Sequence, residues 1–128
     1  MTAPSAEERD AIFKAFGRAY FKQDLDAMYE VVTPDFTWSV LEEGEMRVLS
    51  DRDSIAAFFE ERRGRNRDVR FSDVVYHHAP EATFMTFRIT GVHVASDTPF
   101  ERLGVERYTF KDGKIAVKDV YARPVPAA

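Results

Sequence analysis

The first third of the chain has apolar residues at the three- and four-residue spacing of helices. One predicted helical face carries Ile12, Phe13, Phe16 and Tyr20. Ser5 and Glu8 stand three positions apart, which is the spacing of a capping box at the start of a helix. The pattern therefore predicts a first helix that begins near Ser5.

Two further helices are predicted from the same spacing. The second has the apolar stripe Leu25, Met28, Val31 and Val32. Asp24 can cap this helix, and Thr33-Pro34 would end it because the residue before a proline avoids the α conformation. The third has Ile55, Phe58, Phe59 and Arg62 at helical spacing. Ser50 gives its start signal, and Gly64 is placed to end it.

From Phe36 onward the period of the apolar residues becomes two, which is typical of half-buried strands. The predicted strands cover residues 36–40, 69–77, 82–95, 103–110 and 114–122. Residues 42–45 are predicted to form a loop, and Asp112-Gly113 is typical of a tight turn between the last two strands. Helices followed by a mostly antiparallel sheet define an α+β fold.

The composition is typical of one globular domain covering residues 1–128. Apolar residues make up 45% of the chain, which is ample material for a core. The net charge of −4, with both signs scattered, is a poor match for a nucleic-acid surface. With no leader pattern and no apolar run of membrane-spanning length, we expect a cytoplasmic protein with no membrane partner. The absence of Cys excludes disulfides and thiolate chemistry, and we expect no metal or other cofactor.

Strand alternation places one acid among inward-facing aromatic residues. Glu106, Tyr108 and Phe110 share a face of their strand. Met85, Phe87 and Ile89 share a face of the strand before it. Continued alternation puts His93 on that same apolar face, whereas a bulge at Gly91 would turn it to the surface, and both alternatives remain open.

The last predicted strand is apolar on both faces. One face carries Ile115, Val117, Asp119 and Tyr121, and the other carries Ala116, Lys118, Val120 and Ala122. A sheet with two apolar faces needs two covers. We therefore expect helices on one face and a second copy of the chain on the other, in a homodimer that buries Val117 and Tyr121.

Three groups of residues carry a resemblance to a known family. They are the segments 19–28 (AYFKQDLDAM) and 33–38 (TPDFTW), the helix 54–59 (SIAAFF), and the closing hairpin 107–115 (RYTFKDGKI) with Tyr121. The chain resembles the nuclear transport factor 2-like superfamily, in particular its small bacterial SnoaL-like and ketosteroid-isomerase-like members. This resemblance covers nearly the whole chain. It implies a cystatin-like cone of three N-terminal helices on a curved sheet, a deep apolar pocket between them, and a sheet-to-sheet homodimer.

The resemblance also implies catalytic positions that can be checked residue by residue. The base of ketosteroid isomerases corresponds to Val40, their helix tyrosine to Phe16, and their protonated acid to Glu106. Valine cannot abstract a proton and phenylalanine cannot donate one, so steroid isomerisation is not supported. An aspartate used by epoxide hydrolases of this fold corresponds to Val120, and that mechanism is not supported either.

Glu106 is the strongest catalytic candidate, with two alternatives for its state. As a pocket acid facing apolar walls, its carboxyl would have a pKa raised by burial and could donate or shuttle a proton. The alternative is a structural ion pair with Lys118, which the family register places inward on the neighbouring strand.

The predicted pocket combines residues from several elements. It comprises Phe16, Trp38, Val40, Phe59, Met85, Phe87, Tyr108, Lys118 and Val120. Each of the apolar members, taken alone, is equally well explained as ordinary core. Tyr20 could donate its hydroxyl to a bound carbonyl or simply pack in a helix, and His93 could act as a base near neutral pH.

Two polar runs are better explained by structure than by chemistry. His77 and His78 are adjacent on a strand and point to opposite faces, which disfavours a metal site. The run Arg62-Arg63-Gly64-Arg65-Asn66-Arg67 could touch an anion, but with acids on both sides we interpret it as a solvated helix end.

Two hypotheses for function follow. The first is a small-molecule enzyme, an isomerase, cyclase, dehydratase or hydrolase, that transfers protons on a hydrophobic ligand with Glu106, Tyr20 and His93. The second is a non-catalytic ligand-binding or dimerisation module that keeps the pocket of the fold.

Overall fold

The computed structural model describes residues 3–42 and 44–126, and it has the predicted α+β architecture. The helices are α1 (Ala6–Lys22), α2 (Leu25–Tyr29) and α3 (Arg52–Arg65). The strands are β1 (Val32–Glu42), β2 (Glu45–Leu49), β3 (Asn66–His78), β4 (Thr83–His93), β5 (Thr98–Lys111) and β6 (Lys114–Pro124). Within these described residues no helix is long and apolar enough to cross a membrane.

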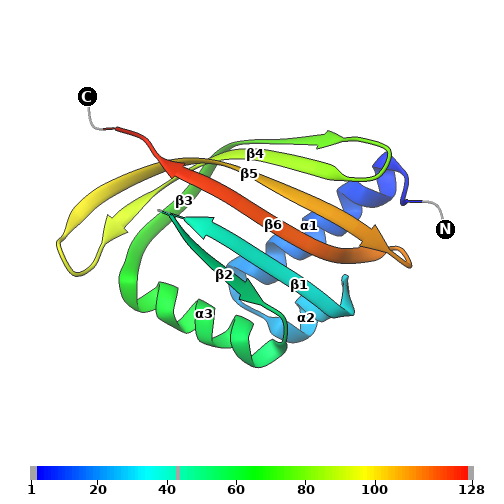
Figure 1. The fold of residues 1–128 in the computed structure, drawn as a ribbon, viewed down its shortest axis with the longest axis horizontal. Helices are drawn as coiled ribbons and strands as arrows, with labels where there is room; N and C mark the ends of the chain where they lie inside the picture. Colours follow the sequence, from blue (N-terminus) through cyan, green and yellow to red (C-terminus); the bar gives the residue numbers. More distant parts are fainter. Residues whose placement is uncertain (1–2, 43, 127–128) are drawn as a thin grey trace.

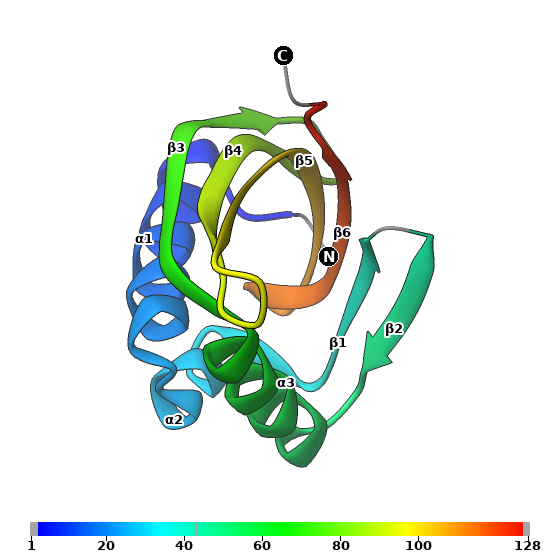
Figure 2. The same cartoon turned by 90° about the vertical axis from the view of Figure 1, so that its left-hand side faces the viewer.

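The six strands form one open, curved sheet in the order β2-β1-β6-β5-β4-β3. Neighbouring strands are antiparallel except for β1 and β6, which are parallel. The helices lie against one side of the sheet (Figure 1), and the end-on view shows strands β3 to β6 curling around that side (Figure 2). None of the three helices of the described residues lies on the opposite face of the sheet.

The predicted starts of the first two helices are confirmed by their caps. The Ser5 hydroxyl accepts from the Glu8 amide at 3.2 Å, and the Ser5 amide donates to the Glu8 carboxylate at 2.9 Å. This reciprocal pair satisfies amide groups that have no partner within the helix. The Asp24 carboxylate accepts from the Ala27 amide at 3.1 Å and starts α2 in the same way.

Several predicted element ends are wrong. The second helix ends at Tyr29, and Thr33-Pro34 lies inside β1 because the extended conformation suits both residues. The third helix begins after Asp51, which caps it in place of Ser50, and it continues through Gly64 to Arg65. Strand β2 was not predicted; it falls partly in the predicted loop 42–45, of which residue 43 lies outside the described residues.

The predicted faces of the last strand also need correction. Thr109 pairs with Val117 but Phe110 pairs with Ile115, so Ala116 is an extra residue in β6. This bulge reverses the alternation. Ile115 is therefore fully buried, whereas Val117 and Tyr121 remain on the opposite, outer face.

The structure decides the alternatives for His93. The β4–β5 register runs without a shift through Gly91, so Gly91 is not a bulge and the alternation continues to His93. A Cβ at Gly91 would come within 2.7 Å of the Phe100 ring, which explains the glycine by close packing. His93 is half-buried and stacks on Phe100 with ring centroids 4.6 Å apart.

Strand β3 is the outermost strand beside β4, and two interruptions break its pairing. Its register with β4 shifts between Arg67 and Arg70 and again between Ser72 and Val75. Asp68 and Asp73 lie within these breaks with φ values of 55° and 54°. Short Asp side chains tolerate this left-handed conformation, and the bulges bend the strand.

A buried arginine ties α1 to the hairpin between β3 and β4. Arg9 is 4% exposed, and its guanidinium donates to the carbonyl oxygens of Pro4 at 2.8 Å and Pro80 at 3.1 Å. It also donates to the Ala82 carbonyl and the Thr83 hydroxyl, both at 3.2 Å. These bonds satisfy a charge that would be costly to bury alone.

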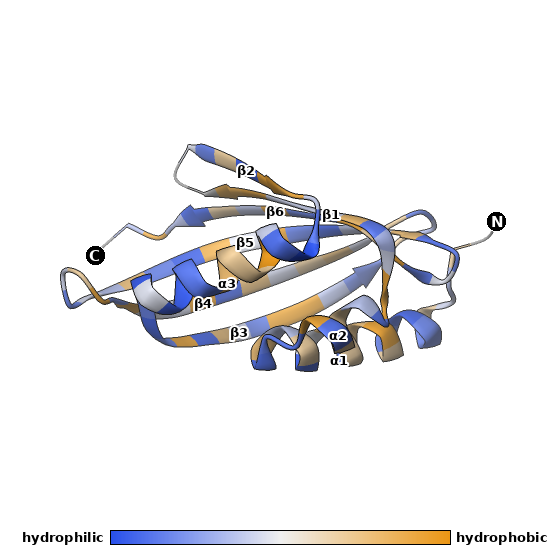
Figure 3. Cartoon of the chain, turned by 90° about the horizontal axis from the view of Figure 1, so that it is seen from below, coloured by the Kyte–Doolittle hydropathy of each residue, from blue (hydrophilic) through white to orange (hydrophobic). Residues whose placement is uncertain are grey.

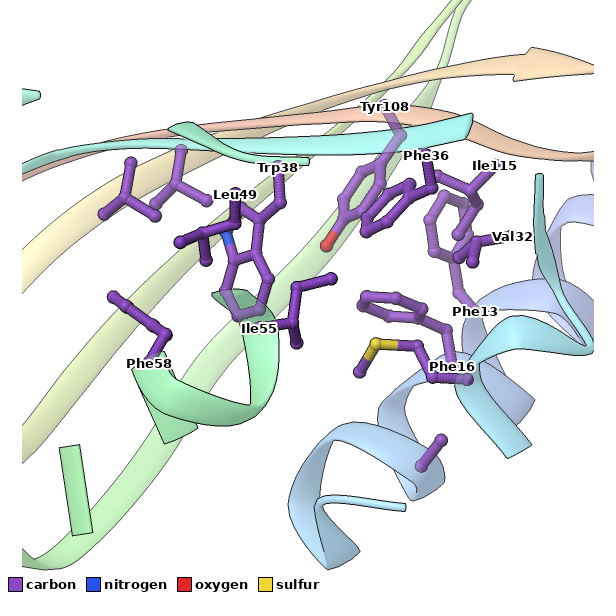
Figure 4. Close-up of a cluster of buried hydrophobic side chains, with 14 of the residues drawn as sticks. Phe13, Phe16, Val32, Phe36, Trp38, Leu49, Ile55, Phe58, Tyr108 and Ile115 are labelled. Atoms are coloured by element: carbon purple, nitrogen blue, oxygen red, sulfur yellow. The ribbon is translucent and has the colours of Figure 1, made fainter. Parts of the chain in front are cut away.

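The core fills the space between the helices and the concave side of the sheet. Its labelled members converge from α1, α3 and the strands β1, β2, β5 and β6 (Figure 4). The largest fully buried apolar and aromatic side chains are Trp38, Tyr108, Phe36, Met28, Ile55, Ile115 and Val32. This aromatic core borders the cavity described next.

Candidate functional site

A cavity of about 340 Å³ lies between α3, the end of α1 and the concave side of the sheet. Its apolar walls include Tyr20, Trp38, Val40, Phe58, Phe59, Phe71, Phe87, Ile89 and Val120. Its polar and charged lining includes Gln23, Arg62, Arg63, Asn66, Arg67, Asp68, Arg102 and Glu106. The volume and the mostly apolar walls suit a small organic molecule.

Glu106 lies in the cavity wall and belongs to a buried polar network. The Tyr108 hydroxyl donates to Glu106 Oε1, and Lys118 Nζ lies 3.6 Å from the same oxygen. Only 3% of the Lys118 side chain and 6% of the Glu106 side chain are exposed. The structure thus shows the Lys118 pair that the sequence left as one of two alternatives for Glu106.

Lys118 also sits among four aromatic rings. Its Nζ lies 4.3 Å from the Trp38 ring centroid, 4.6 Å from that of Tyr20, 5.0 Å from that of Phe16 and 5.9 Å from that of Tyr108. The negative faces of such rings attract a cation. Together with Glu106 they offset the cost of burying an ammonium group.

Burial changes the proton affinities of this network in opposite directions. Burial lowers the pKa of the Lys118 ammonium, and the nearby Glu106 charge opposes that shift. Burial raises the pKa of the Tyr108 hydroxyl well above its ordinary value, and Glu106 adds to the rise. The pKa of Tyr76 is raised too, first by burial and then by the Glu106 charge. Both tyrosines therefore stay protonated near neutral pH, and Tyr108 donates its hydrogen bond to Glu106.

The arrangement gives Glu106 the role of an acceptor. The Tyr108 hydroxyl donates to the carboxylate, and the Lys118 ammonium lies beside it. Both contacts are made by Oε1. A carboxylate held in this way can receive a hydrogen bond or a proton from a molecule in the cavity.

The predicted site residues divide into those on the cavity wall and those behind it. Of the predicted residues, Tyr20, Trp38, Val40, Phe59, Phe87, Glu106 and Val120 line the cavity. Phe16, Met85, Tyr108 and Lys118 are buried in the adjoining core and are not lining residues. His93 is not on the wall either and packs on Phe100.

The arginines of the lining are functional candidates that the sequence pattern did not predict. Arg62, Arg63 and Arg67 belong to the run interpreted as a solvated helix end, yet all three line the cavity. The fold brings the end of α3 and the start of β3 to the cavity mouth, which spacing along the chain does not reveal. Arg102 has the same parity as Glu106 on β5, so strand alternation could have found it.

The adjacent histidines have separate local partners. His78 Nε2 lies 2.9 Å from the Asp10 carboxylate and its Nδ1 lies 2.9 Å from the Thr83 hydroxyl. His77 Nε2 lies 3.4 Å from the Thr86 hydroxyl. In the part of the chain that the structure describes, no group of three or more His, Asp or Glu side chains could hold a metal ion.

Solved structures share this fold over most of their length. An NTF2-like protein from Burkholderia xenovorans LB400 has a TM-score of 0.78 at 18% identity, over 92% of this chain and 91% of its own. A candidate polyketide cyclase from Xanthomonas campestris pv. campestris has a TM-score of 0.71 at 18% identity, over 90% of each chain. A protein of ketosteroid isomerase-like fold from Catenulispora acidiphila DSM 44928, in complex with trimethylamine, has a TM-score of 0.69 at 14% identity, over 86% and 83%. At these identities the likeness shows the fold alone.

Comparison of the sequence with models of protein families identifies the family of this chain. No curated protein matches the chain. The family model for the SnoaL-like domain matches residues 13–118, which include α3, strands β1 to β5 and the Glu106–Lys118 pair. The chain belongs to the SnoaL-like domain family, built on the nuclear transport factor 2-like fold.

Proposed function

We propose that this chain binds a small hydrophobic molecule in the cavity and that Glu106 exchanges a proton with it. The observation that carries the proposal is the Glu106 carboxylate, which is buried in a cavity lined mostly by aromatic and aliphatic side chains, whereas Asp68, the other carboxylate of the described lining, is exposed. Isomerases, cyclases, dehydratases and hydrolases can each use such a group for proton transfer to or from a bound substrate. The candidate polyketide cyclase among the similar structures is consistent with this class of chemistry.

The proposed step uses the network around Glu106. The carboxylate takes a proton from the ligand, and the negative charge passes from Glu106 to the ligand. The Lys118 ammonium lies 3.6 Å from the carboxylate and compensates charge at this end of the cavity. Glu106 then returns this proton, or one exchanged with water, to a carbon of the ligand, which leaves the ligand without the extra negative charge and the carboxylate charged again. Tyr108 keeps its own proton throughout and orients the carboxylate.

The second candidate function is a binding module without catalysis. The observation that favours it is the ion pair itself, because Lys118 gives Glu106 a structural role that needs no substrate. The two functions share the cavity and differ in whether Glu106 moves a proton. They can therefore be separated by one measurement on a bound ligand.

The cavity is tested first, with the neutral fluorescent probe N-phenyl-1-naphthylamine. We expect saturable binding to the wild type, and loss of binding in Ala122→Phe, which adds a ring to the lining. Ala57→Phe, at an exposed position on α3 outside the lining, is the matched control and keeps the affinity. Absence of probe binding to the wild type would contradict the proposal.

Proton exchange is tested on the ligand that stays with the protein through purification, identified by native mass spectrometry. In deuterated water the wild type is expected to introduce deuterium into this ligand. The variant Glu106→Gln with Lys118→Met removes both charges of the pair and should bind the ligand without exchange. Binding without deuterium uptake by the wild type would favour the non-catalytic module.

A further inference from the structure

Four arginines belong to the described lining of the cavity, and two of them, Arg63 and Arg67, are exposed where the cavity opens to solvent. Arg62 and Arg63 come from the last turns of α3, Arg67 from the start of β3, and Arg102 from β5. The end of α3 and the start of β3 form a largely hydrophilic stretch in the view from below (Figure 3). Apolar side chains of the lining, among them Phe21, Val69 and Phe71, come from α1 and β3.

Two of these guanidinium groups are held in place by aromatic rings. Arg102 is 5% exposed and lies over the Phe100 ring at 4.6 Å. Arg62 is half-buried and lies over the Phe58 ring at the same distance. Stacking of this kind fixes the plane of a guanidinium and leaves its edge to donate hydrogen bonds. An arginine preorganised in this way suits a carboxylate, sulfonate or phosphate group.

The sign of charge at the mouth is opposite to that of the whole chain. The chain carries a net charge of −4. Among the described lining residues, however, four are arginines and only Asp68 and Glu106 are acidic. Glu106 is already compensated by Lys118, which lies behind the wall. A local excess of positive charge beside an apolar cavity favours an amphipathic anion.

The arginines are part of existing networks. Arg67 bonds to the carboxylates of Asp68 and Asp97, and Arg62 and Arg102 have further interactions besides their rings. An anionic ligand would accept hydrogen bonds from these arginines in addition to, or in place of, their present partners. The electrostatic attraction to the mouth depends on the sum of the charges and remains after local pairing.

We infer that the ligand of this cavity is an amphipathic anion, whose apolar body fills the cavity and whose acidic group binds at the arginine-lined mouth. This inference rests on the proposed function and narrows its ligand class. It assigns Arg63 and Arg67 to recognition, although their run reads in the sequence as a solvated helix end.

The test compares two probes with one skeleton. 1-Anilinonaphthalene-8-sulfonate carries a sulfonate, and N-phenyl-1-naphthylamine lacks it. Arg63→Gln with Arg67→Gln should weaken sulfonate binding by about three- to tenfold and change binding of the neutral probe by less than about twofold. Raising NaCl from about 0.05 to 0.5 M should weaken binding of the sulfonate probe to the wild type. Binding of the neutral probe to the wild type should not change.

The matched control removes two charges from the same segment outside the cavity. Arg65 and Arg70 are exposed and are not lining residues, so Arg65→Gln with Arg70→Gln should leave both probes unchanged. Equal weakening of both probes by the mouth variant, or equal loss of sulfonate binding in the control, would overturn the anion inference while the cavity function stands. Failure of both probes to bind the wild type would overturn the proposed function and this inference with it.

Discussion

Lys118 Nζ lies 3.6 Å from Glu106 Oε1, and both side chains are almost completely buried. Their strands are neighbours, and Tyr108 pairs with Lys118 across the same ladder. The register of β5 on β6 therefore brings the Glu106 carboxylate, the Lys118 ammonium and the Tyr108 hydroxyl together. A buried pair of this kind depends on both of its members.

Removal of one member should destabilise the fold. Glu106→Gln leaves a buried ammonium without its counter-charge, and we expect a loss of about 3–5 kcal/mol in the free energy of unfolding, measured by urea titration. Adding Lys118→Met removes the stranded charge and should recover most of the loss. A stable single variant would show that the pair contributes little.

The raised pKa of Tyr108 predicts a specific pH dependence. The ordinary value is 10.0, so above that pH the unfolded chain gives up the Tyr108 proton while the folded protein keeps it. Stability present below pH 10 is then lost as pH rises, with a slope of about 1.4 kcal/mol per pH unit for one proton.

Tyr108→Phe has no hydroxyl at this position and therefore lacks the loss of stability that is linked to the Tyr108 proton. Its unfolding free energy should improve relative to that of the wild type as pH rises above 10.0, in urea titrations at a series of pH values. Lys118 is present in both proteins, so its lowered pKa contributes to both curves. Tyr121→Phe, at an exposed tyrosine, is the control. Parallel curves for Tyr108→Phe and the wild type would contradict the prediction.

Arg9 should be a main stabiliser of α1 on the β3–β4 hairpin. Arg9→Ala takes the donor from several buried carbonyl oxygens, and we expect a loss of about 2–4 kcal/mol in chemical unfolding. Arg18→Ala, at an exposed position of the same helix, should cost less than about 0.5 kcal/mol. Similar losses of unfolding free energy in both variants would contradict the prediction, because they would show that the buried hydrogen bonds of Arg9 contribute little.

The outer face of the sheet is the expected homodimer interface. Tyr121, Met46 and Val48 are 47%, 61% and 60% exposed on this face. We expect the wild type to scatter light as a dimer at high micromolar concentration and Tyr121→Lys to scatter as a monomer, because a charge there would be buried. Val94→Lys, an exposed apolar position at the end of the β4–β5 hairpin, is the control. A monomeric wild type would remove the basis of this expectation.

The parts of the fold that follow local rules could be predicted. Ser5, Asp24 and the Asp112-Gly113 turn act through neighbours a few residues away, and all three are where the sequence placed them. Strand alternation also gave Glu106 its inward direction, since β5 has no bulge before Phe110. Local pattern and tertiary structure agree at these positions.

The errors arise where a strand changes phase or where distant segments meet. The extra residue at Ala116 has no marker in the sequence, so Ile115 was assigned to the wrong face. Gly91 looked like a bulge but is small because Phe100 packs against it. Arg63 reaches the cavity only because α3 leads directly into β3 beside the mouth.

The two left-handed aspartates of β3 bear on how copies of this protein can meet. An uninterrupted outer strand offers a long row of free amide and carbonyl groups on which another chain can assemble. Asp68 and Asp73 divide β3 into short runs and bend its border, so an incoming strand finds few consecutive partners. Growth into fibre-like stacks is thereby hindered along this border. Copies would associate face to face, in a pair that closes on itself.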